Sequence, residues 1–231
     1  MTWEDPWLAA RWPFVLQHLP PVPARVVEIG CGPAGGFVPA LTRAGYDAVG
    51  VDPEAPDAPG YVRTEFERYD PGQADAVVAC TSLHHVADLD EVLNRVAGAL
   101  TPQGTLVVVE WAWERLDEAT ARWGFAQVAR APIGSEPTWL HRCEDEWVTS
   151  GLPWEVCLRA WTGEAGLHTC DAILTALDTR FERRHFSPGP YLFPDLADTS
   201  EADEQAAIDA GHIRATGLRY VGRRRPDDDG L

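Results

Sequence analysis

The sequence predicts an α/β protein with a mostly parallel, doubly wound sheet that helices cover on both faces. Three observations support this fold class. Strands and helices alternate between residues 25 and 112, the strands are continuous apolar runs, and a glycine-rich loop joins the first strand to the first helix. The length of 231 residues fits one large domain that carries an insertion.

The first half of the chain supplies five predicted strands in order. The third is the weakest, and the five cover residues 25–29, 47–51, 61–66, 75–80 and 106–110. Helices are predicted at 37–44 and 89–100. The second helix is well marked because Asp88 can cap it and because its apolar residues recur at helical spacing: Leu89, Val92, Leu93, Val96 and Leu100.

The pattern changes after Trp111. Residues 113–178 predict helices and contain no convincing strand, whereas two further strands are predicted at 181–186 and 213–221, with a helix near 200–210 between them. We therefore expect one domain with three parts: an N-terminal arm over 1–19, a core over 20–112 and 179–223, and a helical insertion over 113–178.

The ten tryptophans are unevenly placed. Three lie in the first twelve residues and seven lie between Trp111 and Trp161, so the insertion is Trp-rich. Two interpretations fit this pattern equally well. The aromatic side chains line a ligand pocket that the insertion closes like a cap, or they fill the insertion's own core.

Composition excludes several function classes. Thirty-six acidic residues against nineteen basic ones give a net charge of −17, which repels a phosphate backbone, so no nucleic-acid partner is expected. Five cysteines without a CxxC pair favour a reducing compartment, and no leader or membrane-length apolar stretch is seen, so we expect a cytoplasmic protein without a membrane partner. No metal site is predicted, because the His-x-Cys pairs at 141–143 and 168–170 lack the usual zinc spacing. A monomer and a homodimer both stay open.

The strongest motif is the loop Val27-Glu-Ile-Gly-Cys-Gly-Pro-Ala-Gly-Gly36, followed by Asp52 at the end of the second strand. Glycines permit a tight turn and a close ligand, and an acid at this distance accepts ribose hydroxyls of an adenosine. A nicotinamide dinucleotide also fits, but its pyrophosphate needs free N–H groups and no nearby anion. Here Glu28 precedes the loop, Pro33 removes an N–H, and no Lys or Arg is present. A cationic ligand such as S-adenosylmethionine (SAM) is therefore favoured, and an NAD(P)-dependent oxidoreductase is the alternative.

These motifs resemble those of the class I SAM-dependent methyltransferases. The matching segments are 27–32, 50–52, 75–86 and 100–110, and the two C-terminal strands fit the family's closing hairpin. The resemblance implies a Rossmann-like sheet of seven strands whose last strand is antiparallel. It also implies SAM as cofactor, S-adenosylhomocysteine (SAH) as product, and methyl transfer to an O or N atom of a small molecule, with an aromatic acceptor among the candidates.

By position, the resemblance also implies the cofactor-binding residues. Glu28, Gly30, Cys31 and Gly32 are expected around the methionine moiety. Asp52, followed by Pro53, is expected at the ribose. The remaining two residues, Glu67 and Cys80, are expected near the adenine.

Methyl transfer from a sulfonium is an in-line displacement, and a hydroxyl or ammonium acceptor must also lose a proton. His85 and His84 follow the fourth strand, at the sheet end where ligands gather, so either is a candidate base. The alternative for each is a capping or packing role. His168 is a second choice within the insertion. A non-catalytic SAM-binding partner protein is a further alternative, because the sequence does not single out one base.

Overall fold

The structure is a computed structural model that describes residues 5–128 and 138–225. The chain forms two compact units. The first contains Met1–Glu110, Asp171–Ser187 and Arg219–Leu231, and the second contains Trp111–Cys170 and Pro188–Leu218. The division into a core and a helical insertion over 113–178 stays a prediction.

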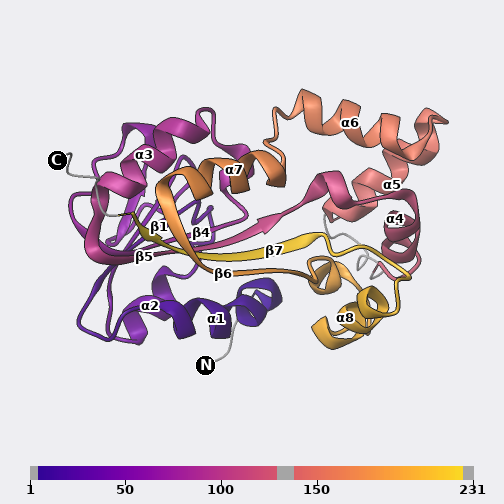
Figure 1. Cartoon of the computed structure of the whole chain (residues 1–231). Helices are drawn as coiled ribbons and strands as arrows, with labels where there is room; N and C mark the ends of the chain where they lie inside the picture. Colours follow the sequence, from indigo (N-terminus) through magenta and orange to yellow (C-terminus); the bar gives the residue numbers. More distant parts are fainter. Residues whose placement is uncertain (1–4, 129–137, 226–231) are drawn as a thin grey trace. The chain divides into compact units, whose positions relative to one another are not determined.

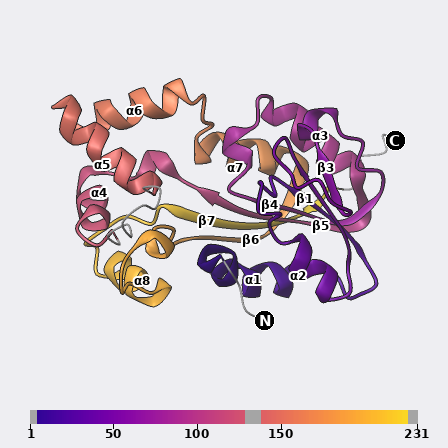
Figure 2. The ribbon, with the colours of Figure 1, turned by 180° about the vertical axis from the view of Figure 1, so that it is seen from behind.

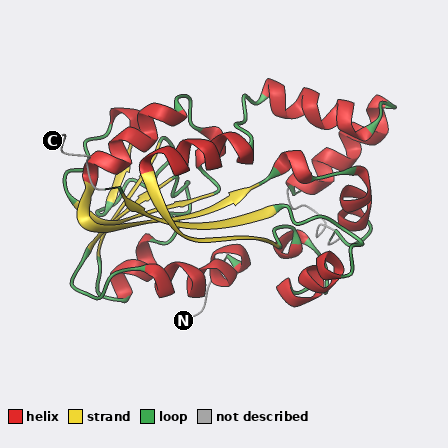
Figure 3. Cartoon of the chain, in the orientation of Figure 1, coloured by secondary structure: helices red, strands yellow, loops and turns green. Residues whose placement is uncertain are grey.

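A seven-stranded sheet organises the fold, as predicted, with strand order β3-β2-β1-β4-β5-β7-β6 (Figures 1 and 3). Six strands are parallel and the last is antiparallel. The strands are β1 (Arg25–Ile29), β2 (Asp47–Asp52), β3 (Tyr61–Arg63), β4 (Ala74–Cys80), β5 (Leu100–Trp111), β6 (Phe181–Gly189) and β7 (Gly217–Arg224). The central strand β1 pairs in parallel with β2 on one side and β4 on the other, so their carboxyl ends meet at one edge.

Several strand boundaries differ from the prediction, and three of the differences have a local cause or neighbour worth naming. Strand β3 ends at Arg63, because its pairing with β2 stops at Asp52 and Phe66 then enters a short 3-10 helix, η1 (Phe66–Arg68). Strand β5 begins at Leu100, directly after the preceding helix. Strand β7 begins at Gly217, because the amide of Arg214 donates to the hydroxyl of Thr120 instead of joining the sheet.

Helices cover both faces of the sheet in the first unit, which confirms the doubly wound class (Figures 1 and 2). Helices α3 (Leu89–Ala99) and α7 (Cys170–Arg180) pack on one face, with Val27, Val77 and Val108 of the sheet. Helices α1 (Pro6–His18) and α2 (Val38–Arg43) pack on the other, with the alternate strand residues Val26, Val78 and Val107. Each strand thus buries apolar side chains on both sides.

The N-terminal segment is the helix α1, which begins after the N-cap Asp5 and has Pro6 in its first turn. Trp12 on this helix is buried and stacks on Phe37, with ring centroids 6.0 Å apart. This segment, expected as an arm, therefore contributes a tryptophan to the core of the sheet.

The second unit contains the helices α4 (Glu118–Phe125), α5 (Trp139–Ser150), α6 (Trp154–Glu164) and α8 (Glu201–Asp209), together with the short helices η3 (Trp113–Arg115) and η4 (Phe193–Asp195). Its aromatic side chains pack against one another. Trp111 lies 4.8 Å from Trp139 and stacks on Tyr191 at 5.9 Å, and Trp154 meets Trp147 edge-on at 5.2 Å. The Trp-rich segment thus builds an aromatic core of its own. Within 5–128 and 138–225, no helix has the length and apolarity that crossing a bilayer requires.

Candidate active site

The glycine loop brings the ends of β1 and β4 unusually close. Gly30 has φ +77° and its amide donates to the carbonyl of Val51 at 2.8 Å. A Cβ at this position would lie only 2.3 Å from the Cβ of Ser82, which follows β4. Only glycine permits both the left-handed backbone and this approach.

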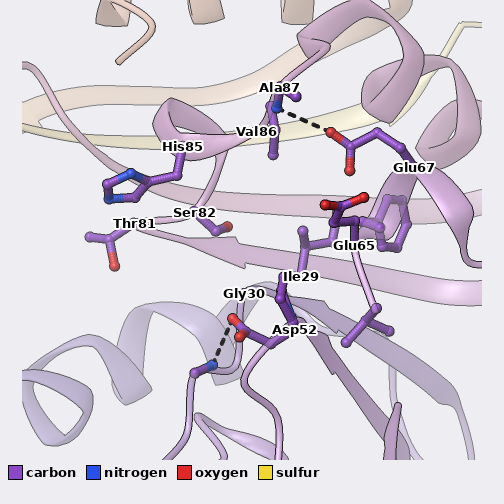
Figure 4. A pocket seen from close by; sticks show the side chains of 14 residues that line it. Ile29, Gly30, Asp52, Glu65, Glu67, Thr81, Ser82, His85, Val86 and Ala87 are labelled. Carbon is purple, nitrogen blue, oxygen red and sulfur yellow. Dashed lines mark hydrogen bonds between the residues drawn. The ribbon is translucent and has the colours of Figure 1, made fainter. Parts of the chain in front are cut away.

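A pocket of about 430 Å³ opens at the carboxyl ends of the strands in the first unit (Figure 4). This is the edge at which open α/β sheets bind ligands. The wall residues come from β1, β2, the β3–η1 segment and the loop after β4: Ile29, Gly30, Gly32, Val51, Asp52, Pro53, Glu65, Phe66, Glu67, Thr81, Ser82, His85, Val86 and Ala87.

Asp52 is held in the pocket wall by backbone amides. Its Oδ2 accepts from the Gly32 amide at 3.0 Å, and its Oδ1 accepts from the Glu54 amide at 2.7 Å. A carboxylate has about four acceptor positions, so each oxygen keeps capacity for a ligand hydroxyl. The acid predicted at the ribose is therefore fixed beside the glycine loop, in the pocket.

Glu67 closes the far side of the pocket. Its Oε1 accepts from the amides of Ala87, at 3.1 Å, and Asp88, at 3.4 Å, at the start of α3 (Figure 4). Between these polar ends the wall is apolar, with the buried Phe66 as its largest side chain. A polar rim around an apolar wall is the usual composition of a small-ligand site.

Glu28 does not line the pocket. Its buried carboxyl group accepts two hydrogen bonds from the Phe37 amide, at 2.8 and 3.0 Å, beneath the glycine loop. Burial raises the pKa of Glu28 to about 8, although hydrogen bonds from the amides of Phe37 and Val38 oppose the rise. The negative charge expected at this strand end is therefore largely absent at neutral pH.

Cys31 and Cys80 also lie outside the pocket wall. Cys31 points toward Gly50, and Cys80 packs in the cluster that contains Trp12. Burial raises the pKa of Cys31 to about 12 and the pKa of Cys80 well above its ordinary value. The two residues after Cys80, Thr81 and Ser82, line the pocket instead.

Several wall residues escaped the sequence reasoning, which followed motifs. Ile29 ends β1 and Thr81 directly follows β4, while Val51 and Ser82 each lie within two residues of the last residue of β2 or β4. Proximity to the carboxyl end of a strand could have identified these four residues, because parallel strands present their carboxyl ends to the ligand. The remaining ones are Glu65, Phe66, Val86 and Ala87.

The three candidate histidines occupy different environments. His85 lines the pocket and keeps only part of its surface exposed. His84 is buried, and its Nδ1 lies 2.6 Å from Oε2 of Glu110. His168 belongs to the second unit, where its carbonyl accepts from the Trp113 indole. The pocket thus contains one of the three.

The ring of His85 is tuned by its surroundings. Partial burial lowers the pKa of His85 below its ordinary value of 6.5, the adjacent His84 lowers it further, and Glu110 opposes the shift. The neutral imidazole is therefore the prevailing form at pH 7.

In the described part of the chain, no group of three or more His, Cys, Asp or Glu side chains is arranged to hold a metal ion.

Comparison with known proteins relates this site to a family. A family described as a methyltransferase domain matches residues 7–142. Ubiquinone biosynthesis O-methyltransferase from Bradyrhizobium sp. (strain ORS 278) is 32% identical over an alignment of 139 positions, and the match covers 53% of this chain and 51% of that protein. The chain thus spans about half the length of the curated relatives it matches.

Solved structures share the fold at lower identity. A SAM-dependent methyltransferase from Mesorhizobium loti has a TM-score of 0.54 and 21% identity, covering 93% of this chain and 98% of its own. The N-methyltransferase NodS from Bradyrhizobium japonicum WM9, in complex with SAH, has a TM-score of 0.52 and 14% identity, covering 96% and 90%. From the matched segment and the sheet described above, the chain belongs to the class I SAM-dependent methyltransferase family.

Proposed function

We propose that this protein transfers a methyl group from SAM to an oxygen or nitrogen atom of a small molecule, with His85 as the base. One observation carries the proposal. Asp52, the glycine loop and His85 line a single pocket at the carboxyl edge of a sheet built as in this family.

The residues of the pocket fit the cofactor. Its volume of about 430 Å³ lies within the usual range of small-ligand sites, and its apolar side, with Ile29 and Phe66, suits an adenine. Asp52 has acceptor capacity for ribose hydroxyls, and Gly32, where nothing lies within 4 Å of an added Cβ, leaves room for a ligand against the backbone. When bound, SAM supplies an electrophilic methyl group on a positively charged sulfur.

The chain contributes orientation and proton transfer. The anchored Asp52 and the apolar wall hold the ligand in place and exclude water. Orientation of the reacting atoms alone lowers the barrier to methyl transfer by several kcal/mol. His85, neutral at pH 7, accepts the proton that a hydroxyl or ammonium acceptor must lose. Glu28, Cys31 and Cys80 support the pocket from behind in this proposal. In this proposal His84 transfers no proton and acts only by contacting its neighbours, and His168 takes no part in the reaction.

The acceptor is proposed to be a small molecule, with aromatic compounds as the first class to test. The net charge of −17 disfavours a polyanionic acceptor, and the curated relatives are named as O-methyltransferases.

Calorimetry and a transfer assay test the proposal. SAH should bind the protein, and NAD⁺ and NADP⁺ should not. Methyl-labelled SAM should then label an acceptor in a panel of catechols, hydroxybenzoates and aromatic amines. Binding of a nicotinamide dinucleotide without SAH binding would refute the assignment. SAH binding without transfer to any member of a broad panel would favour a non-catalytic SAM-binding role.

A further inference from the structure

The loop after β4 supplies a large part of the pocket, and its backbone is held in an uncommon conformation. Thr81 has φ +52°, a left-handed value that residues with a β-carbon rarely adopt. Ser82 follows, and the short 3-10 helix η2 (Leu83–His85) then carries His85 into the wall. A loop with this backbone needs outside contacts to keep it in one conformation.

Glu110, near the end of β5, provides those contacts. Its side chain is fully buried, and its Oε1 accepts from the amides of Ser82, at 3.0 Å, and Leu83, at 2.7 Å. Its Oε2 lies 2.6 Å from Nδ1 of His84. One carboxylate thus binds three consecutive residues of the loop, and hydrogen bonds to a charged acceptor are the strong ones.

We propose that Glu110 is a positioning residue of the cofactor pocket, which fixes Ser82 against Gly30 and orients His84 beneath His85. This inference rests on the proposed function, since it takes the pocket to be the SAM site. The family-like segment 100–110 ends at Glu110 but gave it no role, because its loop partners lie 26 to 28 residues earlier in the chain.

The first consequence concerns the width of the pocket. Gly30 and Ser82 approach so closely that even a β-carbon on Gly30 would overlap Ser82. A small displacement of the Ser82 backbone therefore changes the gap between the glycine loop and the loop after β4. The hydrogen bond from the Ser82 amide to Glu110 sets that gap.

The second consequence concerns the proposed base. The rings of His84 and His85 lie with centroids 4.1 Å apart and planes at 41°. Because Glu110 binds Nδ1 of His84, it fixes the ring that the His85 ring contacts. Loss of this contact frees both rings, and a misplaced base costs rate even when the cofactor still binds.

Glu110→Gln tests the inference, with Glu204→Gln as the matched control. Glu204 is also fully buried and also accepts from three consecutive backbone amides, those of Tyr191, Leu192 and Phe193, but it belongs to the second unit and does not line the pocket. Both substitutions replace a buried carboxyl group with an amide of the same size. A purely structural role predicts the same behaviour for both variants.

We expect Glu110→Gln to weaken SAH binding about 10-fold and to lower kcat about 100-fold, whereas Glu204→Gln binds SAH within about twofold of the parent. Equal SAH affinity and equal kcat in Glu110→Gln and the parent would overturn the inference. If the parent itself does not bind SAH, the proposed function fails instead, so the two failures are distinguishable.

A measurement on the parent protein covers the case in which Glu110→Gln does not fold. Amide hydrogen exchange at Ser82 and Leu83 should be slow in the SAH-free protein, because both amides donate to the buried Glu110. Exchange as fast as in an unprotected loop would show that Glu110 does not hold this segment, and would overturn the inference.

Discussion

Gly30→Ala perturbs the closest backbone approach in the cofactor pocket. Two costs are expected. An alanine at φ +77° loses about 1–2 kcal/mol to left-handed strain, and its Cβ meets the Cβ of Ser82 at 2.3 Å, an overlap that costs about 1–3 kcal/mol as overpacking. The free energy of unfolding should therefore fall by about 2–5 kcal/mol, a large share of the stability of an ordinary domain.

Gly72→Ala is the matched control. Gly72 has φ +60°, and nothing lies within 4 Å of an added Cβ, so only the strain of about 1–2 kcal/mol applies. Urea denaturation gives the free energy of unfolding of each variant, and calorimetry gives its affinity for SAH. Gly30→Ala should also bind SAH more weakly, because Ser82 must retreat into the pocket wall, whereas Gly72→Ala should bind it as the parent does. Equal destabilisation and equal SAH affinity in the two variants would refute the reasoning.

Three other substitutions test the site. Asp52→Ala should weaken SAH binding by about 1–3 kcal/mol, since it removes the anchored acceptor; unchanged affinity in calorimetry would contradict the assignment. His85→Gln should lower kcat about 10²–10⁴-fold and leave SAH affinity intact. In the parent, kcat/KM should rise with pH through a pKa below 6.5 and level off above it. A kcat/KM that falls with pH across this range would contradict a neutral base. The folded-state pKa of Glu28 is raised to about 8, so the folded protein holds a proton that the unfolded chain releases near pH 4.5. Stability should fall by roughly 1 kcal/mol per pH unit between these values, and Glu28→Gln should flatten this slope in thermal unfolding.

Much of the fold follows from the sequence for a simple reason. Continuous apolar runs such as 75–80 and 106–110 suit a sheet with helices on both faces, and the glycine loop marks where the first strand ends and a helix follows. The edge strand β3 and the start of β7 were less predictable, because β3 pairs with β2 over three residues alone and a hydrogen bond from Arg214 to the distant Thr120 delays the start of β7.

The site was less predictable than the fold. Glu28 and Cys80 were expected to touch the cofactor because of their place in a motif. In a strand, however, alternate residues face opposite sides, and these two share a side with Val26 and Val78, away from the pocket. A sequence does not reveal which side of a doubly buried strand meets the ligand.

The choice between the two histidines depended on a contact distant in sequence. His84 and His85 are adjacent and chemically equivalent in the sequence. The buried carboxylate of Glu110 binds His84 and leaves His85 at the pocket. Only a structure brings residue 110 to residue 84.

All residues that line the described pocket fall within one uninterrupted stretch, residues 29–87. A recombination event that keeps this stretch intact therefore keeps all the residues of the cavity, provided that a carboxylate is retained at position 110. A chimera that exchanges only the segments after Glu110 should therefore keep its affinity for SAH.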